Sequence, residues 1–267
     1  MSHGRETAVM PHPRLRPMLA TAGLKLGLFA LEFATPGLPL IVKEGGADFL
    51  VLDREHSGFG FETVKTVAIG ARAADLPLVV RIAHRHPSEV ARALDAGADG
   101  IMAPLVCSAQ QAAEIVAWAT YPPAGGTRGV GMLLPHDGYR AGPPAAKMAE
   151  ANATRAVIIQ IETREGVENA EAIAALPGVD GLWLGHLDLS CSLGIPGRFD
   201  HPDFLAASAH VAAAAKRHGK ALGRMAGSAD EARRLAADGY DTIALFSDIA
   251  ALQGRLAEAV AALRGGA

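Results

Sequence analysis

The sequence predicts an α/β protein of the (β/α)8 barrel (TIM barrel) class, and three observations support this. Eight apolar runs of strand length alternate with segments of helical periodicity along the 267 residues. Four helical segments end in Gly-x-Asp, directly before an apolar run. The runs are continuously apolar, as is typical of parallel strands buried on both faces. Eight strand–helix units in about 250 residues match the usual size of such a barrel.

The expected strands are, in chain order, 26–31, 49–52, 78–82, 101–106, 157–161, 182–184, 221–225 and 243–246. The even-numbered ones follow the Gly-x-Asp joints, where glycine can end a helix in the left-handed conformation. Ser108 with Gln111, and Ser228 with Glu231, fit the capping box at helix starts. An open doubly wound sheet is the alternative, but residues 31–34 after the first strand do not form its glycine-rich dinucleotide loop.

We expect residues 1–20 to form a flexible tail and residues 21–267 to form one barrel domain. The loop 121–152, rich in glycine and proline, is expected over the carboxyl-terminal face of the barrel, and it lacks the Gly-Lys-Ser/Thr of a phosphate loop.

Only Cys107 and Cys191 are cysteines, and no apolar run approaches the ~20 residues of a membrane span. The formal net charge of −3 gives no reason to expect nucleic acid. We therefore expect a cytoplasmic protein that binds neither nucleic acid nor membranes.

Polar residues follow several expected strands, at the end where barrel active sites lie. Glu162 follows the fifth strand and Asp188 the sixth, so their carboxylates can converge. Two carboxylates with open positions for water and substrate oxygens suit Mg²⁺ or Mn²⁺, with Co²⁺ as a further candidate. The alternative is that they cap helices or pair with Arg164.

Arg81 ends the third strand, where its guanidinium could hold a substrate carboxylate in a bidentate manner. Its alternative role is an ion pair with Asp53 or Glu55. His56 is the candidate general base, because histidine titrates near neutrality, and Asp95 could orient its imidazole.

The loop after the sixth strand contains further candidates. His186, two residues before Asp188, could form the wall of the site or bind the metal. Gln160, Gly185 and Leu187 stand beside the expected metal site, and we expect them to contact substrate.

The lysines argue against one mechanism. A Schiff-base aldolase needs a lysine that projects into the barrel mouth. No expected strand has a lysine at its carboxyl end, and Lys25 and Lys220 precede strands instead. Carbonyl chemistry in this barrel would therefore depend on a metal.

Together these segments resemble the HpcH/HpaI family of metal-dependent (class II) pyruvate aldolases, from about residue 27 to residue 263. The segments that carry the resemblance are Asp53-Arg54-Glu55-His56, Val80-Arg81, Leu94 to Ala98, Tyr121-Pro122-Pro123, Arg128 to Gly131, Gln160 to Thr163, and Gly185 to Ser190. The resemblance implies a divalent metal on Glu162 and Asp188, pyruvate on Arg81, and an acid/base dyad of His56 and Asp95. It also implies a homo-oligomer, commonly a hexamer, in which a C-terminal helix packs on a neighbouring subunit. An apolar stripe suits this helix: Ile249, Leu252, Leu256, Val260 and Leu263.

The implied activity is the reversible cleavage of a 4-hydroxy-2-oxo acid, sugar-acid derived or dicarboxylic, into pyruvate and an aldehyde through a metal-stabilised pyruvate enolate. Two departures affect the expected substrate more than the reaction class. Many members have Gly-Pro-x-Asp where this chain has Gly185-His186-Leu187-Asp188, and the turn between Pro123 and Arg128 is one residue longer. The alternatives are a related lyase, an oxaloacetate decarboxylase or a CoA-thioester lyase that forms the same enolate, a phosphosugar-binding barrel enzyme, and a non-catalytic scaffold.

Overall fold

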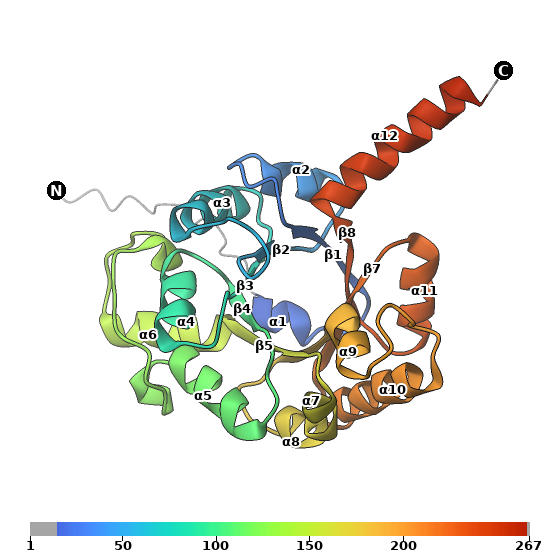
Figure 1. Cartoon of the computed structure of the whole chain (residues 1–267). Coiled ribbons are helices and arrows are strands. Elements are labelled where there is room, and N and C mark those ends of the chain that lie inside the picture. The colour runs from blue at the N-terminus through green and yellow to red at the C-terminus, as the bar shows by residue number, and fades with distance from the viewer. Residues whose placement is uncertain (1–14, 266–267) are drawn as a thin grey trace.

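The computed structural model describes residues 15–265 and contains a closed barrel of parallel strands in the order β1 to β8 (Figure 1). This confirms the predicted (β/α)8 barrel. The strands are β1 (Lys25–Ala30), β2 (Phe49–Asp53), β3 (Leu78–Arg81), β4 (Gly100–Ala103), β5 (Ala156–Ile161), β6 (Gly181–Leu184), β7 (Ala221–Ala226) and β8 (Thr242–Ser247). The fourth is shorter than expected, because Pro104 lacks the N–H that a strand needs and Leu105 adopts a φ of 54°.

The α-helices of the described residues lie mostly around the barrel (Figure 1). They are α1 (Leu15–Leu19), α2 (Leu38–Glu44), α3 (Phe61–Ala73), α4 (Pro87–Asp95), α5 (Ala109–Ala119), α6 (Pro144–Thr154), α7 (Arg164–Glu168), α8 (Ala170–Ala174), α9 (His186–Ser192), α10 (Pro202–Arg217), α11 (Ala229–Ala237) and α12 (Asp248–Arg264). Ser108 and Ser228 cap α5 and α11 as predicted, each accepting a bond from the backbone N–H of the third residue after it. The side chains of Gln111 and Glu231 in turn accept hydrogen bonds from the backbone N–H of the residue before each cap, Cys107 and Gly227.

The Gly-x-Asp joints have a common structure. Their glycines have φ values of 87°, 111°, 89° and 96° at Gly46, Gly97, Gly178 and Gly239. This left-handed conformation suits glycine, because other residues carry a Cβ that crowds the backbone. Each aspartate then accepts a hydrogen bond from the backbone of the preceding strand, and the pairs are Leu26 N to Asp48, Leu78 N to Asp99, Val157 N to Asp180 and Leu222 N to Asp241. The four joints therefore fix neighbouring strands together at the amino end of the barrel.

Helix α1 closes the amino end of the barrel. Leu15 and Leu19 are 1% and 5% exposed and pack on the interior cluster that includes Phe29, Phe49 and Trp183. These helical residues fall within the tail predicted for residues 1–20, so that prediction is wrong for residues 15–19; residues 1–14 lie outside the described part. The reason is that the barrel interior needs an apolar cover at its amino end, and α1 supplies it.

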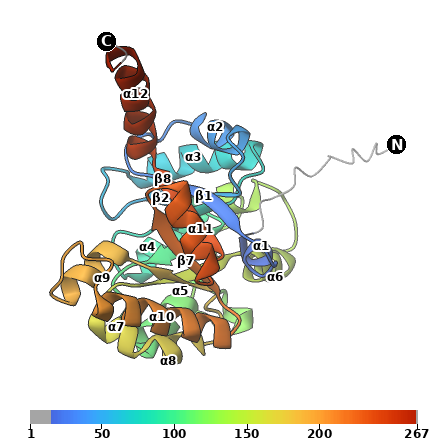
Figure 2. The same ribbon diagram turned by 90° about the vertical axis from the view of Figure 1, so that its right-hand side faces the viewer.

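The segment between α5 and β5 also lies at the amino end, and not over the carboxyl-terminal face as predicted. Helices that follow strands of a (β/α)8 barrel run back to the amino end, so a segment joining the end of α5 to the start of β5 belongs there. Arg72, near the end of α3, donates to the Pro135 carbonyl, and Arg155, just before β5, donates to the His136 carbonyl at 2.5 Å. Figure 2 agrees, with α1 and α6 on one side of the barrel and α9 on the other.

The buried side chain of His136 gives this segment a pH-dependent stability. Burial, followed by the charges of Arg128 and Arg155, lowers the pKa of His136 from 6.5 to about 3. A depressed folded-state pKa adds stability that is complete above pH 6.5 and is lost as the pH falls towards 3. We expect the free energy of unfolding, measured with urea, to fall by on the order of a few kcal/mol more in the wild type than in His136→Gln over this pH range. The same substitution at the exposed His210 is the control, and equal pH slopes for all three proteins would contradict the prediction.

Helix α12 leaves the barrel and projects into solvent (Figures 1 and 2). Most of its side chains are exposed beyond its first two residues, with Val260 half-buried, and Leu252, Leu256 and Leu263 are 58%, 62% and 86% exposed. Among residues 15–265, no helix is long and apolar enough to cross a membrane.

Candidate active site

An ion-pair cluster lies at the carboxyl ends of β2 and β3. Arg81 donates from Nε and Nη2 to the two carboxylate oxygens of the fully buried Asp53, at 2.7 and 2.6 Å. Its Nη1 lies 3.2 Å from Glu55 Oε2. Burial alone would lower the pKa of Arg81, but the bond to Asp53 and the nearby carboxylates raise it above its ordinary value. The ion pair considered as an alternative role is therefore present, and of the five guanidinium N–H groups about two remain for a substrate carboxylate.

Glu162 follows β5 and is 2% exposed. Its Oε1 accepts from the Leu105 backbone N–H at 2.6 Å, and its Oε2 accepts from the Gln160 side-chain amide. Leu105 has a φ of 54°, a conformation that is sparsely populated for leucine. Burial raises the pKa of Glu162 to about 7; the two hydrogen bonds oppose this, and the Glu55 and Asp188 carboxylates add to it.

The acidic groups of the site fit a divalent cation. The Asp188 carboxylate raises the pKa of both Glu55 and Glu162, and the Glu55 carboxylate raises that of Glu162, so negative charge is in excess there; Asp188 itself is exposed. Residues 15–265 contain no group of three or more His, Cys, Asp or Glu side chains placed to hold a metal. A cation on Glu162 and Asp188 would therefore have two protein ligands and open positions, which suits a hard ion that keeps water and takes substrate oxygens.

Gly185, at the end of β6, has no room for a side chain. A Cβ there would lie 2.7 Å from the Cβ of Glu162 and 3.0 Å from Nε2 of Gln160, and closest to Oε2 of Glu162. The adjoining Leu187 is 57% exposed at the rim. Glycine at 185 thus lets the carboxylate and the amide lie against the backbone.

We expect Gly185→Ala to lower kcat/KM by about a hundredfold, because the added methyl group must displace Glu162 or Gln160. Steady-state kinetics measures the loss, and circular dichroism checks the fold. Gly227→Ala is the control, since its Cβ would make only ordinary contact, 3.6 Å from Glu231. Equal activities of the two variants would contradict a close fit at Gly185.

His56 and Asp95 are not brought together within the chain. His56 lies after β2 at the barrel mouth, with its side chain 58% exposed and Nε2 3.9 Å from Glu55. Asp95 is the last residue of α4, at the opposite end of the barrel, where it accepts from Arg128 Nη2 at 2.6 Å. No hydrogen bond or ion pair joins His56 to Asp95 in the described structure. The resemblance therefore implied a dyad that one chain does not form by itself.

His186 packs against an aromatic ring. Its ring meets Phe199 edge-on, with centroids 5.1 Å apart. Burial and then Arg224 lower its pKa to about 4, so it is neutral near pH 7. These contacts favour a wall role over metal binding.

The phosphosugar alternative requires a phosphate at the loops after β7 and β8. After β7, Glu231 already accepts the Gly227 N–H at 2.8 Å. After β8, the buried Asp248 accepts the backbone N–H groups of residues 31–33. Both loops thus contain carboxylates, which disfavour a phosphate, and the Gly227 N–H is already engaged.

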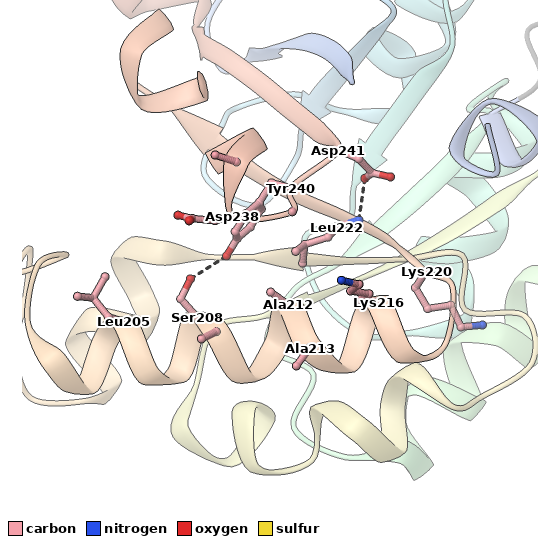
Figure 3. A pocket seen from close by; sticks show the side chains of 13 residues that line it. Leu205, Ser208, Ala212, Ala213, Lys216, Lys220, Leu222, Asp238, Tyr240 and Asp241 are labelled. Atoms are coloured by element: carbon pink, nitrogen blue, oxygen red, sulfur yellow. Dashed lines mark hydrogen bonds between the residues drawn. The ribbon is translucent and has the colours of Figure 1, made fainter. Parts of the chain in front are cut away.

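A cavity of about 730 Å³ lies outside the barrel, between α10 and α11 (Figure 3). Tyr240 and Ser208 are hydrogen-bonded across it at 2.8 Å. Lys220 and Asp241, which directly precede β7 and β8, line the end of this cavity that lies nearest the amino end of the barrel. This cavity is therefore separate from the acidic groups at the carboxyl ends of the strands.

Sequence reasoning missed two contributors. Glu55 was considered only as a partner of Arg81, although it stands in the same four-residue motif as His56. The Leu105 N–H was missed because a backbone donor with positive φ leaves no signature in a leucine.

The chain matches the HpcH/HpaI aldolase/citrate lyase family over residues 25–253. It belongs to this family. The 5-keto-4-deoxy-D-glucarate aldolase of Klebsiella pneumoniae is 34% identical over 91% of this chain and 93% of its own length. The hydroxypyruvate/pyruvate aldolase of Chromohalobacter salexigens is 38% identical, over 87% and 91%. A solved HpcH/HpaI aldolase from Desulfitobacterium hafniense has a TM-score of 0.88 and 31% identity, over 94% of this chain and 96% of that one.

These similarities confirm the family and the class of enzyme predicted from the sequence, a carbon–carbon lyase of the pyruvate aldolase type. The HpcH/HpaI relatives span the whole barrel of this chain, so the similarity includes the site at the ends of β2, β3, β5 and β6.

Proposed function

We propose that this HpcH/HpaI family member is a divalent-metal-dependent aldolase that reversibly cleaves a 4-hydroxy-2-oxo acid into pyruvate and an aldehyde. The observation that carries the proposal is that Arg81, which retains free N–H groups, lies close to the carboxylates of Glu55 and Glu162. A 2-oxo acid can place its carboxylate on Arg81 and its neighbouring keto oxygen near a cation held at Glu162. We further propose Mg²⁺ or Mn²⁺, or else Co²⁺, as the metal and the cytoplasm as the location.

Glu162 and Asp188 would hold the cation, which would act as a Lewis acid towards charge that develops on the keto oxygen. Arg81 binds the substrate carboxylate, and Gln160, Gly185 and Leu187 border the substrate. His56 accepts the proton of the C4 hydroxyl group as the C3–C4 bond breaks, and the bonding electrons move into the pyruvate enolate. The aldehyde leaves, and protonation at C3 gives pyruvate.

We propose that the dyad of His56 and Asp95 forms between two copies of the chain. Asp95 lies on the outside of the barrel with its side chain 28% exposed, and Val130 and Leu133 nearby are 54% and 56% exposed. An exposed apolar rim around a carboxylate is typical of a surface that another molecule covers. The exposed apolar stripe of α12 provides a second contact, so we propose a homo-oligomer, with a hexamer as its size.

Metal removal tests the reaction class. We expect EDTA to abolish pyruvate release from a panel of 4-hydroxy-2-oxo acids, and Mg²⁺ or Mn²⁺ to restore it. Borohydride with pyruvate should leave the enzyme active, because Lys25 and Lys220 are held at the amino end by backbone carbonyls. Borohydride inactivation through a lysine would overturn the scheme. Turnover of oxaloacetate but of none of the hydroxy acids would favour a decarboxylase.

A further inference from the structure

The end of β8 is irregular where it pairs with β1. Gly27 lies opposite Ala244, but Phe29 lies opposite Ser247, so two steps along β1 correspond to three along β8. Phe246 sits in this bulge with a φ of 63°, a conformation that is uncommon for an aromatic residue. Such strain persists only where surrounding contacts hold it. The bulge sets the position of Asp248, two residues later.

Asp248 binds the loop that follows β1. Its Oδ1 accepts from Leu31 N at 3.0 Å, and its Oδ2 accepts from Glu32 N at 2.9 Å and from Phe33 N at 2.7 Å. The carboxylate is 5% exposed and also accepts the N–H of Ile249 in its own helix. Within residues 15–265 it forms no ion pair, so backbone amides alone compensate its charge. Three consecutive amides on one carboxylate fix the path of residues 31–33.

This loop borders the active site. The guanidinium of Arg81 lies over the ring of Phe29, 4.9 Å from its centroid. Leu31, two residues after Phe29 and just past the end of β1, packs on the same interior cluster as Phe29. Glu32 and Phe33 continue past the strand end, and Phe33 is 43% exposed. Residues 31–33 therefore form the side of the mouth next to Arg81.

We propose that Asp248 is a positioning residue that holds residues 31–33 as one wall of the subsite for the aldehyde. This rests on the proposed aldolase function. The carboxylate and keto groups of pyruvate are taken by Arg81 and the groups around Glu162, so the aldehyde must meet C3 of pyruvate from the open mouth. The wall's position then decides which aldehydes fit, and it depends on the first residue of α12.

The experiment compares Asp248→Asn with Ser247→Ala. In Asp248→Asn, an NH₂ group can replace Oδ2 and face the N–H groups of Glu32 and Phe33, donor against donor. Ser247→Ala is the matched control, because it removes the cap of α12, a bond from Ala250 N to Ser247 Oγ, and leaves the loop contacts. Two readouts are used with saturating Mn²⁺: exchange of the pyruvate methyl protons into D₂O, and KM for short and long aldehydes in the condensation direction.

We expect Asp248→Asn to raise the KM for the preferred aldehyde about tenfold and to flatten the preference between short and long aldehydes. Proton exchange and Ser247→Ala should both stay near wild type. The proposal would be overturned if Asp248→Asn lost proton exchange and condensation equally, or if its KM for aldehydes did not change. It would also be overturned if Ser247→Ala showed the same change in KM. If Asp248→Asn does not fold, Phe33→Ala replaces it and must change aldehyde preference. Wild-type enzyme that fails to exchange pyruvate protons would instead contradict the proposed function.

Discussion

Glu162→Gln is expected to lower kcat/KM by about a thousandfold or more, which corresponds to about 4 kcal/mol of transition-state stabilisation. The substitution keeps the size of the side chain and its bond from the Leu105 N–H, and the Gln160 amide can turn so that its otherwise unpartnered Oε1 accepts from the new NH₂ group. It removes the negative charge that would hold the cation. Mn²⁺ binding, followed by electron paramagnetic resonance, should weaken in parallel. Because burial already raises the pKa of Glu162 to about 7, the neutral amide should not destabilise the fold.

Glu165→Gln is the matched control, since Glu165 is exposed in the first turn of α7, three residues further along the chain. It should bind Mn²⁺ and turn over substrate like the wild type. Glu162→Gln that retained both Mn²⁺ binding and activity would remove the basis for metal chemistry at this site.

Mixing two inactive variants is expected to restore activity. His56→Ala and Asp95→Ala should each be nearly inactive as pure proteins, because every site would lack one member of the dyad. If each site takes His56 from one copy and Asp95 from another, random mixed oligomers should regain about a quarter of wild-type activity. Co-expression with two different tags allows the mixed oligomers to be purified and assayed.

Two controls accompany this experiment. Mixing either variant with itself, through two tags, should restore nothing. A mixture of Glu162→Gln and Arg81→Met should also stay far below the dyad mixture, because Arg81 and Glu162 are proposed to act within one chain; substantial recovery there, or none with the dyad pair, would contradict the assignment.

The barrel and most of its strand boundaries were predictable because apolar runs and Gly-x-Asp joints are local signals. Glu162 and Arg81 were predictable for the same reason, since the end of a parallel strand fixes where its side chain lies. The course of 121–152 was not predicted, because glycine and proline signal a loop without saying which end of the barrel it covers. Counting from strand to helix would have supplied that answer, since the loop lies between a helix end and a strand start.

The role of Asp95 was harder to predict than that of Glu162. The family resemblance implied that Asp95 pairs with His56. The sequence of one chain does not show whether the two residues of a pair belong to the same copy. The end of α4 and the end of β2 lie at opposite ends of the barrel, and only the arrangement of elements reveals that separation. The sequence also places Asp248 directly after the eighth strand. Its partners, however, are backbone amides, and no pattern of side chains predicts them.

The four aspartates of the Gly-x-Asp joints have a consequence for how the chain folds. Each bonds to the start of the strand just before it, across sequence separations of only 22, 21, 23 and 19 residues. The barrel is therefore divided into four strand pairs, β1–β2, β3–β4, β5–β6 and β7–β8, each closed by its own local contact. Short loop closure costs little entropy and speeds folding, so each quarter can form before the ring closes. The repeated joint therefore gives each quarter of the barrel a local closing contact of its own.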